Sequence, residues 1–395
     1  VRSIIRFPCP TPIMREYDLK VLDSLAEIPA AEWDALVDNN PTLRHALLQS
    51  MIDAGCTTAK GGWLPQFLTL WRDGEQSDGK PSLSGAVPLY VKSHSYGEYV
   101  FDWAWAQAYD RHGLDYYPKL LSAVPFTPCT GGRLLARTAA DKKILIDALM
   151  SLAEQSEVSS LHVLFPEDAD HQLLIKAGMM PRTSIQFHWQ NANYKTFDDF
   201  LATMSHDKRK KVKQERRKVS EAGITFRRLV GSEIADADWD FFTSCYDHTY
   251  RAHHSTPYLN REFFGLIGER MPENILLIVA EREGKQIASA LNLFSRRALY
   301  GRYWGGVEFH SGLHFETCYY QALEFCVARG IAVFEGGAQG EHKLARGFLP
   351  VKCHSAHWLK EPQFARAVED FLLRESGGIE RYVDELGDSS PFKST

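Results

Sequence analysis

Apolar residues recur along the chain at two spacings, one typical of helices and one typical of strands. Residues 141–155 carry Ile144, Leu145, Ala148, Leu149 and Leu152 at intervals of three and four, which predicts an amphipathic helix. Residues 313–330 are apolar on almost every side, which predicts a buried helix that ends at a glycine. The apolar run at 331–334 then predicts a buried strand.

Further strands are predicted on both sides of these helices. Residues 275–304 give two alternating strands around the turn Glu-Gly-Lys at 283–285, followed by a third strand. Earlier in the chain, residues 160–165 and 184–189 are predicted strands, and residues 168–178 between them form a short helix closed by glycine. Together these elements predict mixed sheets flanked by helices.

The chain also contains an internal repeat. The segments KAGMMPRTSIQFHW (176–189) and ARGFLPVKCHSAHW (345–358) share Gly, Pro, His and Trp at the same mutual spacing, at an offset of 169 residues from Lys176 to Ala345. The same offset aligns Gly132 and Arg133 with Gly301 and Arg302, and Phe165 with Phe334. The repeat predicts a duplication, because glycine, proline and tryptophan seldom coincide by chance and have demanding backbone roles.

The duplication predicts two domains. We place the first at residues 1–192 and the second at 193–395, with a basic helix opening the second. The first copy carries an aromatic-rich insertion at 96–118 that has no counterpart in the second copy. This insertion could form a pocket wall for a sugar or acyl group, or it could only cover a core.

Composition and charge narrow the class of protein. The 395 residues are 44% hydrophobic, which is enough to build two cores. The formal net charge of −5 argues against a surface that binds nucleic acid everywhere, although it permits a local basic patch. Cysteines occur singly, without a CxxC pair, so neither a disulfide framework nor a metal site is predicted. The sequence shows neither an apolar run of about 18 residues nor a signal segment, so we expect no membrane span and a cytoplasmic chain.

The order of elements, given twice, resembles the tandem arrangement of Fem-type peptidyltransferases in the GNAT acyltransferase superfamily. The words LYGRYWG, LHFETCYYQALEF and FEGGAQGEHKLARGF resemble the Fem-like family labelled peptidoglycan biosynthesis or recognition proteins. The resemblance implies an α/β fold of mixed sheets, with tandem duplicated GNAT-like domains in the Fem-type arrangement. It also implies N-acyl transfer to an amine-bearing acceptor such as a peptidoglycan precursor.

The same resemblance implies that no cofactor is permanently bound. The co-substrate would be aminoacyl-tRNA, with tRNA then a partner, or an acyl-coenzyme A. The stretch RYWGGVEFHSGLHFE departs from the usual GNAT pyrophosphate loop, which weakens the coenzyme A interpretation.

Candidate chemistry concentrates in residues 334–350, after the buried strand of the second copy. Backbone N–H groups of a glycine turn can hold an anion, and nearby cations can anchor a substrate. Acyl transfer also needs a base for the attacking amine. The alternative is a tight strand-to-helix turn with solvated charges. The candidates for acid–base catalysis are Glu335, Glu341 and His342, and those for substrate binding are Gly336, Gly337, Gly340, Lys343 and Arg346.

Two neighbouring stretches supply further candidates for substrate binding. Arg302, Tyr303 and Trp304 end a strand, where aromatic groups could stack on a ligand or simply form a core pair. Polar residues recur at intervals of 3, 4 and 3 along the helix that follows, which predicts one polar stripe facing the cleft or water. This stripe comprises His314, Thr317, Gln321 and Glu324, of which His314 and Gln321 are the predicted ligand contacts.

The segment HDKRKKVKQERRK (206–218) holds eight Lys or Arg residues and only two acidic ones. Such density is often a solvated helix face, but in an acidic chain it also forms a stripe that attracts phosphate. The predicted phosphate or RNA contacts are Lys208, Arg209, Lys210, Lys211, Arg216 and Arg217.

These observations predict an N-acyltransferase whose second copy holds the transfer site. Its donor would be aminoacyl-tRNA or acyl-coenzyme A, and its acceptor an amine. The alternative is a non-catalytic binding protein that recognises peptidoglycan precursors or RNA through the same cleft.

Overall fold

The computed structural model describes residues 17–73, 81–337 and 340–393 and divides them into two compact units. The first unit holds the described residues of 1–38, 43–184 and 353–378, and the second holds those of 39–42, 185–352 and 379–395. Each unit contains part of a strand from the other half of the chain, because the boundaries fall inside β9 and β15.

In the second unit, five strands form a mixed sheet. The order is β11-β12-β13-β14-β9, in which β13 and β14 are parallel and the other neighbours are antiparallel. A sixth strand, β10 (Ile224–Val230), pairs with β11 at the edge. The bounds of the five are Ile275–Arg282 for β11, Lys285–Phe294 for β12, Ala298–Gly306 for β13, Val333–Glu335 for β14 and Met180–Gln190 for β9.

The first unit repeats this pattern strand for strand. Its order is β2-β5-β6-β8-β15, again with one parallel pair, β6 and β8, among antiparallel neighbours. The duplication predicted from the sequence is therefore confirmed, and part of the last strand of each copy belongs to the other unit. The bounds are Trp63–Pro65 for β2, Tyr90–Lys92 for β5, Lys119–Ser122 for β6, Ser160–Leu164 for β8 and Leu349–Leu359 for β15.

The strand registers correct part of the repeat alignment. Phe334 of β14 lies opposite Trp189, and the residue opposite the equivalent Trp358 is Leu161 rather than Phe165. Through the parallel pairs, the counterpart of Gly301 is then Ser122 rather than Gly132. The gap-free alignment was wrong here because the two copies differ in the lengths of the segments between equivalent strands. The contiguous division at residue 192 stays a prediction.

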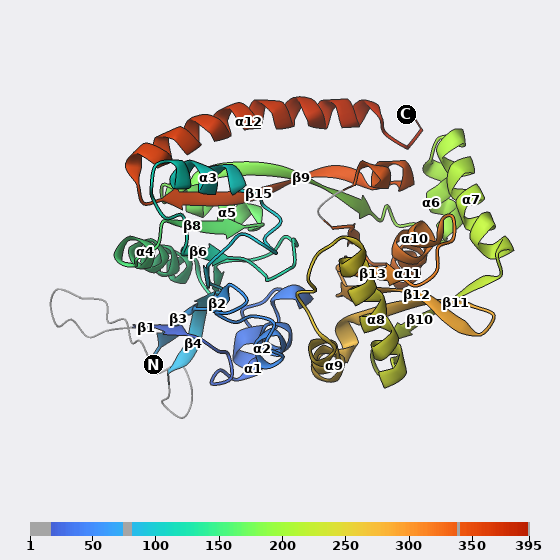
Figure 1. Ribbon diagram of the computed structural model, residues 1–395, viewed down its shortest axis with the longest axis horizontal. Helices are drawn as coiled ribbons and strands as arrows, with labels where there is room; N and C mark the ends of the chain where they lie inside the picture. The colour runs from blue at the N-terminus through green and yellow to red at the C-terminus, as the bar shows by residue number, and fades with distance from the viewer. Residues whose placement is uncertain (1–16, 74–80, 338–339, 394–395) are drawn as a thin grey trace. The chain divides into compact units, whose positions relative to one another are not determined.

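Helices cover both faces of the mixed sheet in the second unit (Figure 1). On one face, α8 (Asp236–Ala252) packs against β12 and β13, with α9 (Arg261–Arg270) beside it. On the other lies a long helix made of α10 (Leu313–Phe315), a π-helical turn Glu316–Tyr320, and α11 (Gln321–Arg329). Apolar side chains of this helix share a core with Leu276, Ile278 and Phe334. The central strands are therefore buried on both faces, rather than alternating as predicted.

The predicted basic helix is two helices. The first, α6 (Phe197–Thr203), starts at a capping box in which the Thr196 hydroxyl accepts a bond from the Asp199 amide and the Asp199 carboxylate accepts one from the Thr196 amide. It ends where Met204 adopts an extended backbone with ψ 154°. The second, α7 (His206–Glu221), carries all the basic residues of the stretch.

The first unit contains a second sheet and several helices around its own core. The sheet has the order β1-β3-β4-β7 and is antiparallel throughout. Its strands are Tyr17–Leu22, Phe67–Arg72, Ser82–Val87 and Leu135–Ala136. The helices are α1 (Ala30–Asp34), α2 (His45–Asp53), α3 (Trp103–Arg111), α4 (Ala139–Gln155) and α5 (Asp168–Lys176), together with the part of α12 (Pro362–Asp388) that precedes Ile379.

The aromatic insertion at 96–118 covers a core and anchors a buried ion network. Trp105, Tyr109 and Tyr116 pack against apolar residues of β15 and α12 in the first unit. The insertion also supplies Glu98 and Asp102, whose carboxylates accept hydrogen bonds from the fully buried Lys119, at 2.8 Å for Glu98. The structure therefore supports the core-covering alternative for this segment.

Lys119→Met tests this network. The substitution leaves two buried carboxylates without their central cation, so we expect a loss of about 3–5 kcal/mol of stability. Thermal unfolding measures it, with the exposed Lys143→Met as the matched control. A melting temperature equal to that of the control would show that the network contributes nothing to folding.

Candidate active site

The parallel strands of the second unit separate beside the glycine loop. Pairing of β13 with β14 runs from Ala298 opposite Val333 to Tyr300 opposite Glu335. There β14 ends, whereas β13 continues to Gly306 against β12 alone. Open α/β sheets bind ligands at the carboxyl ends of their strands, at the point where the connections of neighbouring strands part. We call this the divergence site and define it by Gly301, Glu335, Gly336, Gly337 and Lys343.

Lys343 is the buried cation of this site. It lies in the short 3₁₀ helix Glu341–Arg346, is 3% exposed, and donates a hydrogen bond from Nζ to the Gly337 carbonyl at 3.0 Å. Burial lowers the pKa of Lys343 to about 8, while the charge interaction with Cys318 acts in the opposite direction. The ammonium is therefore mostly protonated at neutral pH and close to titration. Ala338 and Gln339, within the same loop, lie outside the described residues.

Glycine is required where this lysine packs. A Cβ on Gly336 would lie 3.3 Å from Cδ of Lys343 and 3.1 Å from the ring of Phe348. Gly337 has a φ of +85°, a conformation that side chains disfavour. The close approach of the lysine stem at Gly336 and the positive φ of Gly337 favour glycine at both positions.

Two histidines lie next to Lys343. The His314 ring packs at a tilt against Trp304, with 4.8 Å between ring centres, and lies 6.2 Å from His342 by the same measure. Burial, His342 and the cations Arg346 and Lys343 lower the pKa of His314 to about 4. The pKa of His342 is also lowered, by burial and then by Lys343 and Arg346. Both imidazoles are therefore neutral at pH 7, and the solvent-exposed His342 can accept a proton.

Arg346, a predicted substrate contact, and Glu341, a predicted acid–base residue, both hold the loop in place. The Arg346 guanidinium lies 3.3 Å above the centre of the Phe315 ring and donates to the His342 carbonyl at 2.5 Å and to the Glu215 carboxylate at 2.7 Å. Glu341 accepts a hydrogen bond from the Tyr382 hydroxyl. Gly340 leaves room for the His342 ring, since a Cβ there would lie 2.4 Å from Cε1.

Arg302 and Tyr303 face the other side of the sheet. Asn292 lies opposite Gly301 and Leu291 opposite Tyr303, so Arg302 is the extra residue of a β-bulge. Its guanidinium lies 5.0 Å from the Tyr303 ring, which packs edge-on against Tyr246 of α8. Arg302, Glu335 and Glu341 therefore lie in three different environments, because a bulge turns the first away and Tyr382 binds the third.

The predicted polar stripe is divided by the π-helical turn. A π turn joins residues five apart, and Gln321 accordingly donates to Glu316 at 2.8 Å. Gln321 and Glu324 then face α7, whereas His314 faces Trp304 and His342. The Thr317 hydroxyl is buried and bonds to the Leu313 carbonyl. The helical spacing of 3 and 4 assumed an uninterrupted α-helix, and the extra residue of the π turn breaks it.

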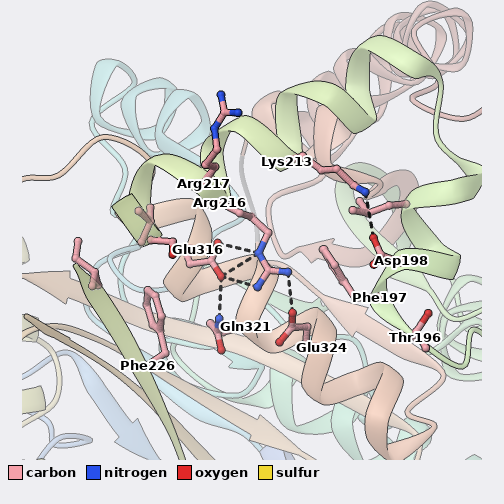
Figure 2. Close-up of a pocket in the computed structure, with 14 residues that line it drawn as sticks. Thr196, Phe197, Asp198, Lys213, Arg216, Arg217, Phe226, Glu316, Gln321 and Glu324 are labelled. Carbon is pink, nitrogen blue, oxygen red and sulfur yellow. Dashed lines mark hydrogen bonds and ion pairs between the residues drawn. The ribbon is translucent and has the colours of Figure 1, made fainter. Parts of the chain in front are cut away.

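Arg216 lines a pocket of about 650 Å³ between α7 and this helix (Figure 2). Its guanidinium bonds to Glu316 at 3.0 Å and to Glu324 at 2.7 Å. It also lies 4.8 Å from the ring of Phe197. Because two carboxylates neutralise it, Arg216 is a poor candidate for the phosphate contact predicted from the sequence.

The outward face of α7 remains strongly cationic. A shallow pocket of about 370 Å³ on it is lined by His206, Arg209, Lys210, Lys213, Gln214 and Arg217. Lys213 and Arg217 make exposed ion pairs with Asp198 and Glu221, at 3.3 and 3.6 Å, which water and salt weaken. Lys208 and Lys211 lie on the same helix outside this pocket. The geometry is suited to a phosphate-bearing ligand.

Several residues that shape the site were not predicted from the sequence. Glu215, the acidic residue inside the basic stretch, binds Arg346 and the Tyr320 hydroxyl. Glu316 is a buried carboxylate in an apolar helix, which was a usable signal. His188 of β9 lies opposite Glu335, and burial and Lys343 lower its pKa to about 4.

Across the described ranges, no set of three or more His, Cys, Asp or Glu side chains is arranged to hold a metal ion. Within the same ranges, no helix has the length and apolarity needed to cross a membrane.

Comparisons with known proteins agree with this fold. A family model named FemAB-like, described as peptidoglycan biosynthesis/recognition, matches residues 24–394. Among solved structures, FemX is 12% identical with a TM-score of 0.54, covering 87% of this chain and 99% of its own. L-PGS from Bacillus licheniformis is 11% identical with a TM-score of 0.50, covering 87% of this chain and 97% of its own. None of the curated proteins compared with the chain matches it. The predicted tandem arrangement of Fem type is thus confirmed.

Lys343→Met tests the buried ammonium. The folded-state pKa of about 8 lies below the ordinary 10.5, so the unfolded chain binds more protons between these values and wild-type stability rises with pH there. At pH 7 we expect the variant to be more stable by up to roughly 3 kcal/mol, and the difference to shrink toward about pH 10. Urea unfolding at both pH values measures this, with the exposed Lys285→Met as control. A pH-independent difference would contradict the buried charge.

Proposed function

The chain belongs to the FemAB-like family, and from this premise we propose that it is an N-acyltransferase whose transfer site is the divergence site of the second unit. The observation that carries the proposal is the buried Lys343 ammonium, which lies against the glycine loop where β13 and β14 separate. A fixed cation in a site of low polarity stabilises the negative charge that develops on a carbonyl oxygen under attack.

The proposed reaction uses Lys343 and His342 in different roles. The nitrogen of a neutral amine attacks the carbonyl carbon of an ester or thioester, forming the new N–C bond and placing negative charge on the oxygen beside Lys343. Neutral His342 accepts the proton that the attacking nitrogen loses and returns it to the leaving oxygen or sulfur as the C–O or C–S bond breaks. The products are an amide and the free alcohol or thiol.

The donor is proposed to carry phosphate groups that bind the outward face of α7. Aminoacyl-tRNA and acyl-coenzyme A both fit this chemistry. The contacts proposed on this face are Arg209, Lys210 and Arg217, with Lys208 and Lys211 beside them. The acceptor is proposed to be an amine of a peptidoglycan precursor, as the family description suggests.

A transfer assay tests the function. Purified protein is incubated with a panel of labelled aminoacyl-tRNAs and acyl-coenzyme A thioesters and with peptidoglycan precursors that carry a free amine, and amide products are followed by mass spectrometry. Formation of an amide with one donor class supports the proposal and identifies that class. Tight binding of a precursor or RNA without any turnover would favour the non-catalytic alternative.

The pH dependence of kcat separates the two catalytic roles. Activity needs protonated Lys343 and neutral His342, so we expect a plateau that ends as Lys343 loses its proton near its pKa of about 8. Lys343→Met is expected to lower kcat by about 10²–10³-fold. Lys343→Arg, which stays charged, is expected to retain part of the activity and to lose the decline near pH 8. A decline that persists in the arginine variant would assign it to another group.

Lys210→Glu tests the donor-binding face. The substitution reverses one charge in the cationic pocket of α7, so the donor KM should rise and the slope of log affinity against log salt should fall by about 1. Lys285→Glu makes the same charge change at an exposed site of the same unit and is the matched control. Equal salt slopes for the two variants would show that this helix face is only solvated.

A further inference from the structure

The π-helical turn is held at both ends by two consecutive residues of α7. Its first residue, Glu316, binds Arg216 through Nε and Nη2 at 3.1 and 3.0 Å. Its last residue, Tyr320, donates a hydrogen bond from its hydroxyl to Glu215. The basic helix thus presents a cationic face outward. On its inner side, the charged side chains of Glu215 and Arg216 contact the helix of the candidate active site.

Glu215 also reaches the loop that carries the proposed catalytic groups. Its second carboxylate oxygen accepts a hydrogen bond at 2.7 Å from Arg346, whose side chain is 3% exposed. Arg346 in turn donates to the backbone carbonyl of His342, four residues earlier in the same 3₁₀ helix. Charge-assisted bonds of this kind are stronger than neutral ones and fix geometry as well as distance.

We infer that Glu215 is a positioning residue, which acts through Arg346 to hold the backbone of His342 and Lys343 in the geometry required for acyl transfer. This inference rests on the proposed function. It assigns α7 two separable tasks, because the residues that face a phosphate-bearing donor are not the residues that hold the loop.

The separation follows from the placement of the side chains. Arg209, Lys210 and Arg217 line the outward pocket, whereas Glu215 is directed to Tyr320 and Arg346. Loss of Glu215 leaves the outward charges in place, so donor binding should persist. It also leaves Arg346 with one fewer partner in a buried position, so the loop loses one of its fixed points.

The charges around the loop give a second expected consequence. His342 is surrounded by Lys343 and Arg346 on its own element and by His314 and Tyr319 on the neighbouring helix. Glu341 is bound to Tyr382, and on the neighbouring strands Glu335 lies opposite His188.

Neutralising Glu215 removes the negative charge paired with Arg346, so positive potential at His342 increases and the pKa of His342 should fall further.

Glu215→Gln is the test, with Glu221→Gln as the matched control on the same helix. Glu221 is 67% exposed and pairs only with Arg217 four residues earlier among the described side chains. In the Glu215 variant, kcat should fall about tenfold or more while the donor KM stays within about twofold. In the Glu221 variant, kcat should not change. Tyr320→Phe, which removes a single hydroxyl that fixes Glu215, should lower kcat in the same direction by a smaller factor and serves if the first variant does not fold.

A titration that needs no turnover accompanies the kinetics. The imidazole pKa of His342 is followed by NMR, with the resonance assigned by its loss in His342→Gln. It should fall in Glu215→Gln and remain unchanged in Glu221→Gln. If wild-type protein transfers no acyl group, the proposed function fails and this titration alone decides the coupling between Glu215 and the loop.

Three results would overturn the inference. These are an unchanged kcat in Glu215→Gln, an increase in donor KM without a change in kcat, and a His342 pKa that moves equally in both glutamine variants. The second result would place Glu215 in donor binding, and the third would show a general effect of charge on α7.

Discussion

The hydrogen bond from the Lys343 ammonium to the Gly337 carbonyl is the interaction on which the geometry of the candidate site depends. It places a cation in the interior of the second unit, where burial opposes its charge and brings its pKa close to neutrality. Glycines 336 and 337 permit the loop to approach the lysine stem, and the loop begins where β14 ends beside the longer β13. A buried charge of this kind lowers stability, so its presence is better explained by chemistry than by folding.

The helix α7 explains how the site could be built from distant parts of the chain. Its sequence looks like a continuous basic stripe, yet Glu215 and Arg216 are taken up by partners about a hundred residues away. What remains on the outside is a cationic face that a phosphate-bearing donor could use. Donor binding and loop positioning are then tasks of one rigid element, performed by different sides of it.

The sequence predicted much of the architecture and less of the site. Gly, Pro, His and Trp in KAGMMPRTSIQFHW and ARGFLPVKCHSAHW revealed the duplication because each glycine precedes an equivalent strand and the other three residues lie in it, with Trp189 and Trp358 opposite equivalent partners. The exchange of these strands between the units could not be predicted, since strand pairing depends on residues far apart in the chain. The π-helical turn shifted the polar stripe, and the β-bulge at Arg302 turned that side chain away, because both add one residue to a regular period. Lys343 was predicted from the sequence as a substrate contact, but its burial could not be predicted because it depends on the fold.

A titration of the Lys343 side chain tests the central claim most directly. The protein is prepared with ¹³C-labelled lysine, and the Cε resonance of Lys343, assigned by its loss in the methionine variant, is followed by NMR as the pH is raised. The account predicts a midpoint near the pKa of about 8 that burial produces. A midpoint near the ordinary value of 10.5 would place this ammonium in water and contradict a buried cation at the transfer site.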